Sequence, residues 1–182
     1  MAHKSSLQTA LIEVVSIVVA VIMGFVVNEW RENRGNQRKA RTAFERITQE
    51  AEENHAQLQD RQDYYRRMIA VIDSLAKTSR QIHSYAEIPG WSGINPPMLS
   101  ASSYKTAASI GVFSYMDFQT ADQISKLYMI QEDLSNLRTT TIQALVTGEL
   151  YREGSIRMMF VVYSELIEGW FGAYRRLTEQ SG

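Results

Sequence analysis

The chain has 182 residues, contains no cysteine, and carries 19 Lys and Arg against 20 Asp and Glu. This length is enough for one membrane anchor and one modest domain. The near-zero net charge implies neither nucleic acid nor an anionic membrane surface as a partner for the whole chain. The lack of cysteine excludes disulfides, thiol catalysis, iron–sulfur ligation and cysteine zinc sites.

An apolar segment near the amino terminus dominates the sequence. It covers residues 10–27 and lies within an expected anchor at residues 7–34. As a helix, about 18 residues extend roughly 27 Å, close to the hydrocarbon thickness of a bilayer. Asn28, Glu29 and Trp30 follow it, where a signal peptide would have the small residues of a cleavage site. We therefore predict one membrane-spanning helix.

One face of this helix carries small and polar residues at spacings of three and four. We call it the packing stripe, and its members are Glu13, Ser16, Ala20, Gly24 and Asn28. Small residues at such spacings let a second helix backbone approach closely. We expect the stripe to contact another membrane-protein chain, with a hetero-complex favoured and a homodimer as the alternative. The competing explanation is chance, because a span rich in Val, Ala and Gly often shows such a ladder.

Polar residues at the two ends of the span predict where it meets the membrane surface. Trp30, Arg31 and Arg34 are typical of the interface, where an amphipathic ring and cations face the lipid headgroups. Glu13, near the other end, costs roughly 2.5–3.5 kcal/mol if it is charged within the bilayer. It therefore lies at the interface or pairs with a donor from a partner chain.

The remaining sequence has helical periodicity. Residues 35–60 are strongly charged and predict a solvated helical stalk, and residues 61–182 predict a helical bundle. Pro and Gly in residues 86–99 predict its one substantial loop. We expect an all-α fold, with a short tail at residues 1–6 and one transmembrane helix that continues into a long helix. An antiparallel bundle of three long helices and one short helix completes it.

Local signals place the elements of the bundle. The long helix is expected to run to about residue 85, and a short helix over residues 100–110 should end at Gly111. Asp117 can cap a helix that ends at Gly148, with apolar residues including Leu145 on its inner face. A last helix is expected over residues 149–177. In the loop, Trp91 and Ile94 either pack on the end of the bundle or form a contact site for a partner.

Two short patterns stand out along the chain. The first joins an acidic residue, a Val/Ile/Gly span, Asn-x-Trp and E-x-x-x-N-x-x-x-L; its residues are Glu13, Gly24, Asn28, Trp30, Glu50, Asn54 and Leu58. The second consists of Thr106, Ala107, Ser109, Gly111, Tyr128 and Gln131. Together they resemble a group of uncharacterised bacterial single-span membrane proteins that has no assigned activity. The amino terminus departs from the group in being shorter and less basic. The resemblance implies an architecture and the bacterial inner membrane, and no chemistry.

The search for a reaction centre finds one weak pattern. Glu52 and His55 have the Glu-x-x-His spacing of two metal ligands on one helix face. A di-iron bundle needs two such pairs and two further glutamates, and no second pair occurs. Phosphate-binding, dinucleotide-binding and haem-attachment motifs are also missing from the sequence. We expect no catalytic, cofactor-binding or metal site.

These observations favour a non-enzymatic accessory or structural subunit of a multi-subunit inner-membrane complex, docked through its span and its helical domain. A membrane-anchored sensor or ligand-binding helical bundle is the alternative. The expected partners are other membrane-protein chains and the lipid bilayer. Orientation is open to two arguments: five cations follow the span, which favours a cytoplasmic domain, whereas the resembling group suggests a periplasmic one. We expect the periplasmic orientation.

Overall fold

The structure is a computed structural model that describes residues 3–78, 87–148 and 154–179, with side-chain surroundings in the first helix described from residue 12 onward. Its elements are α1 (His3–Lys77), α2 (Ser102–Ser109), the 3-10 helix η2 (Val112–Tyr115), α3 (Phe118–Thr147) and α4 (Ser155–Glu179). The prediction of an all-α fold is confirmed. Three expected features lie outside the described residues: residues 1–2 of the tail, the helix end near residue 85, and residue 86, the first residue of the expected loop.

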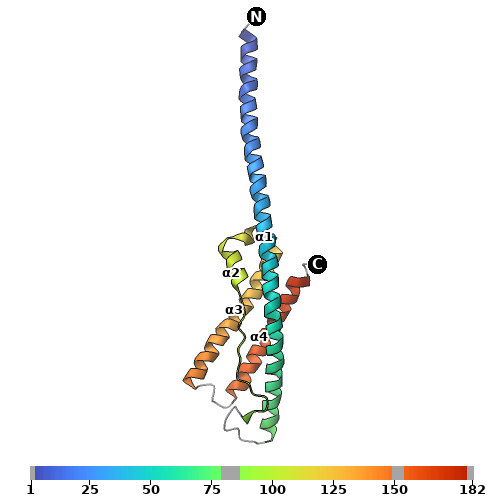
Figure 1. Cartoon of the computed structure of the whole chain (residues 1–182), viewed down its shortest axis with the longest axis vertical. Coiled ribbons are helices and arrows are strands. Elements are labelled where there is room, and N and C mark those ends of the chain that lie inside the picture. Colours follow the sequence, from blue (N-terminus) through green and yellow to red (C-terminus); the bar gives the residue numbers. More distant parts are fainter. Residues whose placement is uncertain (1–2, 79–86, 149–153, 180–182) are drawn as a thin grey trace.

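A single helix, α1, joins the apolar segment to the rest of the chain (Figure 1). It has 75 residues and extends roughly 110 Å at 1.5 Å per residue. It contains no proline, and Gly35, where a kink could form, lies in uninterrupted helix. The amino-terminal part of α1 projects alone from the domain, so any surface that holds this part also fixes the position of the domain.

The domain is formed by three long helices and an extended return segment. α4 packs against both α1 and α3, and it runs antiparallel to each of them (Figure 1). α1 and α3 therefore run in the same direction. This parallel arrangement is made by residues 91–101, which are extended and carry the chain back along the domain to α2.

Packing begins earlier along α1 than the sequence suggests. The solvated stalk expected at residues 35–60 is in large part the first half of the core helix, because Ile47, Ala51 and Leu58 are fully buried and the core begins at Ala40. Small residues here let the neighbouring segments approach closely, and they contribute little to a pattern judged by large apolar side chains. This boundary is a correction to the expected domain organisation.

Aromatic side chains fill the centre of the core between α1 and α4. Tyr65, Phe160, Tyr163 and Trp170 are all fully buried. The Tyr65 ring lies 5.2 Å from that of Phe160 and 5.3 Å from that of Tyr163, measured between centroids. Burying a large apolar side chain stabilises a fold by roughly 1.5–3 kcal/mol, so this cluster is the main apolar attachment of α4 to α1.

The expected helix ends of the α2–α3 region are confirmed. The Asp117 side chain accepts a 2.9 Å hydrogen bond from the Thr120 N–H at the start of α3. Gly111 and Gly148 have φ values of 68° and 77°, in the left-handed region that glycine adopts without strain. Leu145, expected on the inner face, is instead 38% exposed. α4 begins at Ser155, and the expected start at 149 lies outside the described residues.

Candidate functional site

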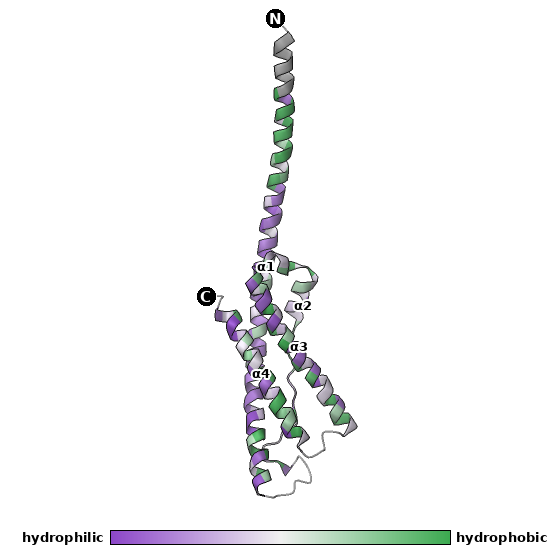
Figure 2. Ribbon diagram, turned by 180° about the vertical axis from the view of Figure 1, so that it is seen from behind, coloured by the Kyte–Doolittle hydropathy of each residue, from purple (hydrophilic) through white to green (hydrophobic). Residues whose placement is uncertain are grey.

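The apolar band of α1 is the most exposed apolar surface of the described chain. Every large apolar side chain from Ile12 to Val27 is 50–71% exposed, and none contacts the domain. Figure 2 shows the band as a continuous hydrophobic stretch followed by a hydrophilic one. Among the described residues, one helix is long and apolar enough to cross a membrane, and it contains this band. Soluble monomers rarely expose contiguous apolar patches of this kind, so the band requires a covering.

All five members of the packing stripe are exposed along this band. The Ser16 hydroxyl donates a 2.8 Å hydrogen bond to the Ile12 carbonyl one turn earlier, so its proton is satisfied within the helix. A Cβ atom added at Gly24 would meet nothing within 4 Å. The stripe therefore presents a shallow surface of small groups, on which a second helix can lie close to the α1 backbone.

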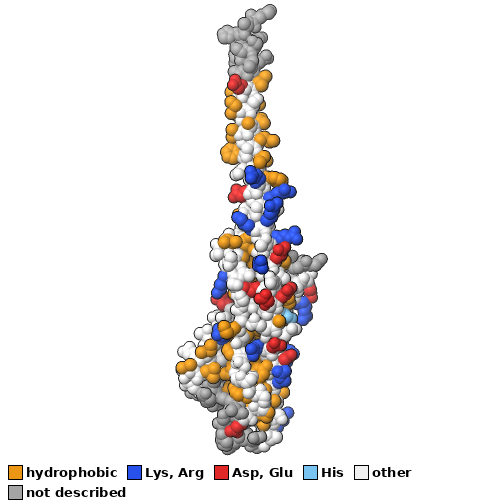
Figure 3. Space-filling model, in the orientation of Figure 1, with side chains coloured by type: hydrophobic (Ala, Val, Ile, Leu, Met, Phe, Trp, Pro, Cys, Tyr) orange, Lys and Arg blue, Asp and Glu red, His pale blue; other side chains and the backbone are white. Residues whose placement is uncertain are grey.

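Trp30 and the arginines after it form a second feature of α1. The Arg34 guanidinium lies over the Trp30 ring, 4.3 Å from its centroid, in a cation–π contact. Arg31 is exposed beside them. Below this level, Lys and Arg side chains gather around α1 between the apolar band and the domain (Figure 3). Of these, Arg41 is paired with Glu45 at 3.2 Å.

The structure gives Trp91 and Ile94 internal contacts. Ile94 is buried, and the half-buried Trp91 ring meets Phe160 edge-on at 6.0 Å. Tyrosines of α1 hold the same segment by its backbone. The Tyr64 hydroxyl donates to the Gly93 carbonyl at 2.6 Å, and the Tyr65 hydroxyl donates to the Asn95 carbonyl at 2.9 Å. These contacts match the packing explanation for the loop better than the partner-contact explanation.

The centre of the domain contains a buried carboxylate with four hydrogen-bond donors. One oxygen of Glu50, Oε2, accepts from the Ser100 hydroxyl at 2.7 Å, the Ser102 hydroxyl at 2.8 Å and the Ser103 N–H at 3.0 Å. The other oxygen, Oε1, accepts from the Tyr128 hydroxyl at 2.6 Å. We call this set the Glu50 network. It joins α1, the end of the return segment, the first turn of α2, and α3.

A second contact continues the network one turn along α1. The Asn54 amide donates to the Ser100 carbonyl at 2.8 Å, and its oxygen accepts from the Ser100 N–H at 2.9 Å. Gln131 donates to the same carbonyl at 2.6 Å and accepts from Asn54 at 3.2 Å. Both backbone groups of Ser100 are thus satisfied by side chains in place of a neighbouring strand, which is the condition for burying extended backbone.

The network changes the acidity of its members. Burial raises the pKa of the Glu50 carboxyl, but the hydrogen bonds from Tyr128, Ser103, Ser100 and Ser102 outweigh this and lower the pKa from 4.5 to about 2. Burial, followed by the hydrogen bond to Glu50, raises the pKa of the Tyr128 hydroxyl. At neutral pH the pair is therefore a carboxylate and a protonated phenol. The phenol donates its proton to the carboxylate in a hydrogen bond. The pair therefore fits a structural contact between α1 and α3 better than a catalytic acid–base pair.

The two sequence patterns meet in this network. Glu50 and Asn54 come from the first pattern, and Tyr128 and Gln131 come from the second. Sequence reasoning assigned them no role. The available signal was that Glu50 and Asn54 share the face of α1 that also carries Ile47 and Ala51, and a polar residue on an apolar face needs a buried partner.

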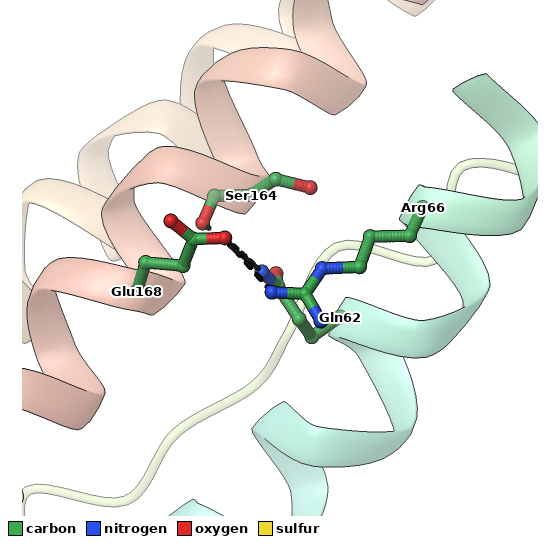
Figure 4. A network of polar contacts seen from close by, with 4 residues as sticks. All are labelled: Gln62, Arg66, Ser164 and Glu168. Atoms are coloured by element: carbon green, nitrogen blue, oxygen red, sulfur yellow. Dashed lines mark hydrogen bonds and ion pairs between the residues drawn. The ribbon is translucent and has the colours of Figure 1, made fainter. Parts of the chain in front are cut away.

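Polar contacts between α1 and α4 lie nearer the surface. Gln62 donates to the Ser164 carbonyl at 3.4 Å and to Glu168 at 3.1 Å, and Arg66 donates to the same Glu168 oxygen at 2.9 Å (Figure 4). The Arg66 and Glu168 side chains are each 59% exposed. Exposed ion pairs contribute roughly 0–1 kcal/mol, so this contact aligns α1 with α4 more than it stabilises them.

The Glu52–His55 spacing does not bring ligands together. The His55 ring stacks on Tyr174 at 4.7 Å and lies 4.9 Å from Phe171, and Glu52 is exposed. Burial lowers the pKa of His55, which favours a neutral ring packed among aromatic side chains. Within the described residues, no group of three or more His, Asp or Glu side chains is arranged to hold a metal ion.

Comparisons with protein families, with curated proteins and with solved structures found no match. The geometry of the chain itself is therefore the basis for its proposed function.

The Glu50 network yields a stability prediction. A carboxyl whose pKa is lower in the folded than in the unfolded state adds stability above the unfolded value, and this stability is lost as pH falls. For Glu50 the loss spans pH 4.5 to about 2. Glu50→Gln should lower the free energy of unfolding at neutral pH by roughly 3 kcal/mol and flatten its dependence on pH in this window. Denaturation followed by circular dichroism measures both.

Glu53→Gln is the matched control, because Glu53 is exposed on the same helix. It should change the free energy of unfolding by less than about 0.5 kcal/mol. Equal losses in the two variants would show that the buried network contributes no special stability.

Proposed function

We propose that this protein is a non-enzymatic accessory subunit of a multi-subunit complex in the bacterial inner membrane. It is anchored by the apolar band of α1 and docks through the packing stripe and the helical domain. The observation that carries this proposal is the uncovered apolar band on a helix that continues unbroken into the core of the domain. Such a helix holds a domain at a fixed height above a bilayer.

The interior of the domain supports a structural role. The buried polar side chains of the Glu50 network bond to one another and to backbone groups. An enzyme or a ligand-gated sensor needs polar groups that converge on a substrate or ligand. A groove of about 550 Å³ lies beside Tyr128 and Gln131, but the hydroxyl and amide there already have partners inside the domain.

The anchor is tested by extraction. The full chain should stay in the membrane pellet after an alkaline carbonate wash, because this wash releases proteins held only by surface contacts. The double variant Val18→Arg, Ile22→Arg should move to the supernatant, since two charges at mid-span cost roughly 5–7 kcal/mol in sum. Release of the unaltered chain would show that α1 does not span the bilayer.

The packing stripe is tested by replacing its smallest residue. Gly24→Leu fills the space needed for close backbone approach, and overpacking a tight contact costs about 1–3 kcal/mol. We expect loss of most of the partner after gentle solubilisation, measured as the protein that co-purifies with the full chain.

Val18→Leu is the control for this test, because Val18 is exposed on the opposite face of the span. It should retain the partner. Equal retention by both variants would mean that the stripe is not a contact surface and that the helical domain alone holds the complex.

For orientation, we propose that the domain faces the periplasm, as the resemblance implies; the cations after the span favour the opposite side. Since the chain has no cysteine, Ser135→Cys provides a single label site on an exposed position of α3. A membrane-impermeant maleimide should label it in intact cells. Labelling that appears only after lysis would place the domain in the cytoplasm.

A further inference from the structure

We propose that the groove between α1 and α2 binds the phosphate headgroup of an anionic phospholipid from the membrane that anchors the chain. The inference rests on the proposed membrane anchor and adds a specific lipid site to it. The groove has a volume of about 520 Å³. It lies at the end of the domain nearest the apolar band, where α2 packs beside α1 (Figure 1).

The accessible wall of the groove is largely apolar, and cations and hydroxyl groups lie along it. α1 contributes three cations, Arg38, Lys39 and Arg46, and α2 contributes the Thr106 hydroxyl, whereas the Ser102 hydroxyl beside it already donates to Glu50. Within the described residues, no Asp or Glu lines the groove. Cations and hydroxyls on two facing helices are suited to a phosphate that carries one negative charge.

These cations have little competition from the protein itself. Arg46 donates to Gln49 at 3.4 Å, which leaves its charge uncompensated. The carboxylate that follows one turn later, Glu50, is occupied by its four donors. Arg38 and Lys39 are exposed and are in no ion pair among those found in the described chain. Their charges are therefore available to an external anion.

The membrane-side end of the groove, at Arg38 and Lys39, is the part nearest the headgroups, and Arg46 lies roughly 12 Å farther along α1 than Arg38. Arg38 follows Trp30 by about two turns, or roughly 12 Å of helix. Side chains on a helix lean toward its amino terminus, which for α1 is the membrane side, so the cations reach back toward the bilayer. A headgroup layer about 5–7 Å deep and the usual tilt of a spanning helix shorten the remaining gap.

The rim of the groove is suited to the glycerol and upper acyl region of a phospholipid. Ile110 lines it and is 61% exposed. At the same end of the domain, Phe118 is 87% exposed and Tyr115 is 47% exposed. Tyr115 lies beside Gln37 and Ala40 of α1, at the level of the groove. Exposed apolar and aromatic side chains next to cations are typical of surfaces that rest on a membrane interface.

The test measures amide hydrogen exchange of α2 in the full chain reconstituted in vesicles. In phosphatidylcholine vesicles that contain phosphatidylglycerol, exchange in Ser102–Ser109 should be at least about fivefold slower than in phosphatidylcholine alone, which is the effect of one cation at an anionic surface. Thr42→Glu, which adds a carboxylate between Arg38 and Arg46 in the groove, should remove this protection. Gln59→Glu, an equal charge change on an exposed face of α1, should retain it.

Three results would overturn the lipid site. They are equal exchange in the two kinds of vesicle, equal loss of protection in the two variants, and equal protection by inorganic phosphate added to phosphatidylcholine vesicles. The last would identify a free anion as the ligand. Flotation with the vesicles separates this test from the anchor. If the chain does not float, the anchor is wrong, and the same comparison with water-soluble, short-chain phosphatidylglycerol decides on the groove.

Discussion

The buried Glu50 carboxylate is the constraint on which the arrangement of the domain depends. Its return segment is extended and cannot satisfy its own backbone, so its register must be set by side chains. Glu50 and Asn54 set it from α1, and Tyr128 and Gln131 set it from α3. Leaving a buried donor without a partner costs about 1–3 kcal/mol. A shift of the segment by one residue would orphan several such groups at once, which makes this register much more stable than its neighbours.

The same network explains why α1 and α3 can run in parallel. Parallel helices need a long crossover, and here residues 91–101 run along the domain partly exposed, with Ile94 and Pro97 as their buried contacts. Farther along the crossover, the Tyr64 and Tyr65 hydroxyls of α1 donate to the Gly93 and Asn95 carbonyls. The polar side chains of α1 therefore replace the strand partner that an extended segment normally has.

The sequence predicts the helices well because local signals determine them. The Asp117 cap and the left-handed glycines at 111 and 148 depend only on neighbouring residues. The packed first half of the domain was assigned to a solvated stalk because it is strongly charged and has few large apolar residues, although Ala51 and Asn54 lie on its helical face and are buried. The Glu50 network was missed for another reason. Its partners are separated by 31 to 78 residues, and nothing in one sequence states that they meet.

The continuous helix between the proposed anchor and the domain has a consequence for the proposed docking. If the band of α1 lies in a bilayer, the packing stripe and the domain would both be held near a partner in that membrane, and the second contact would form at a high effective concentration. Each contact can then be weak alone. A flexible linker would dilute this effect, whereas the unbroken helix through Gly35 preserves it. A lipid bound between α1 and α2 would also affect this second contact. It would limit the tilt of the domain and hence the orientation in which the domain meets a partner.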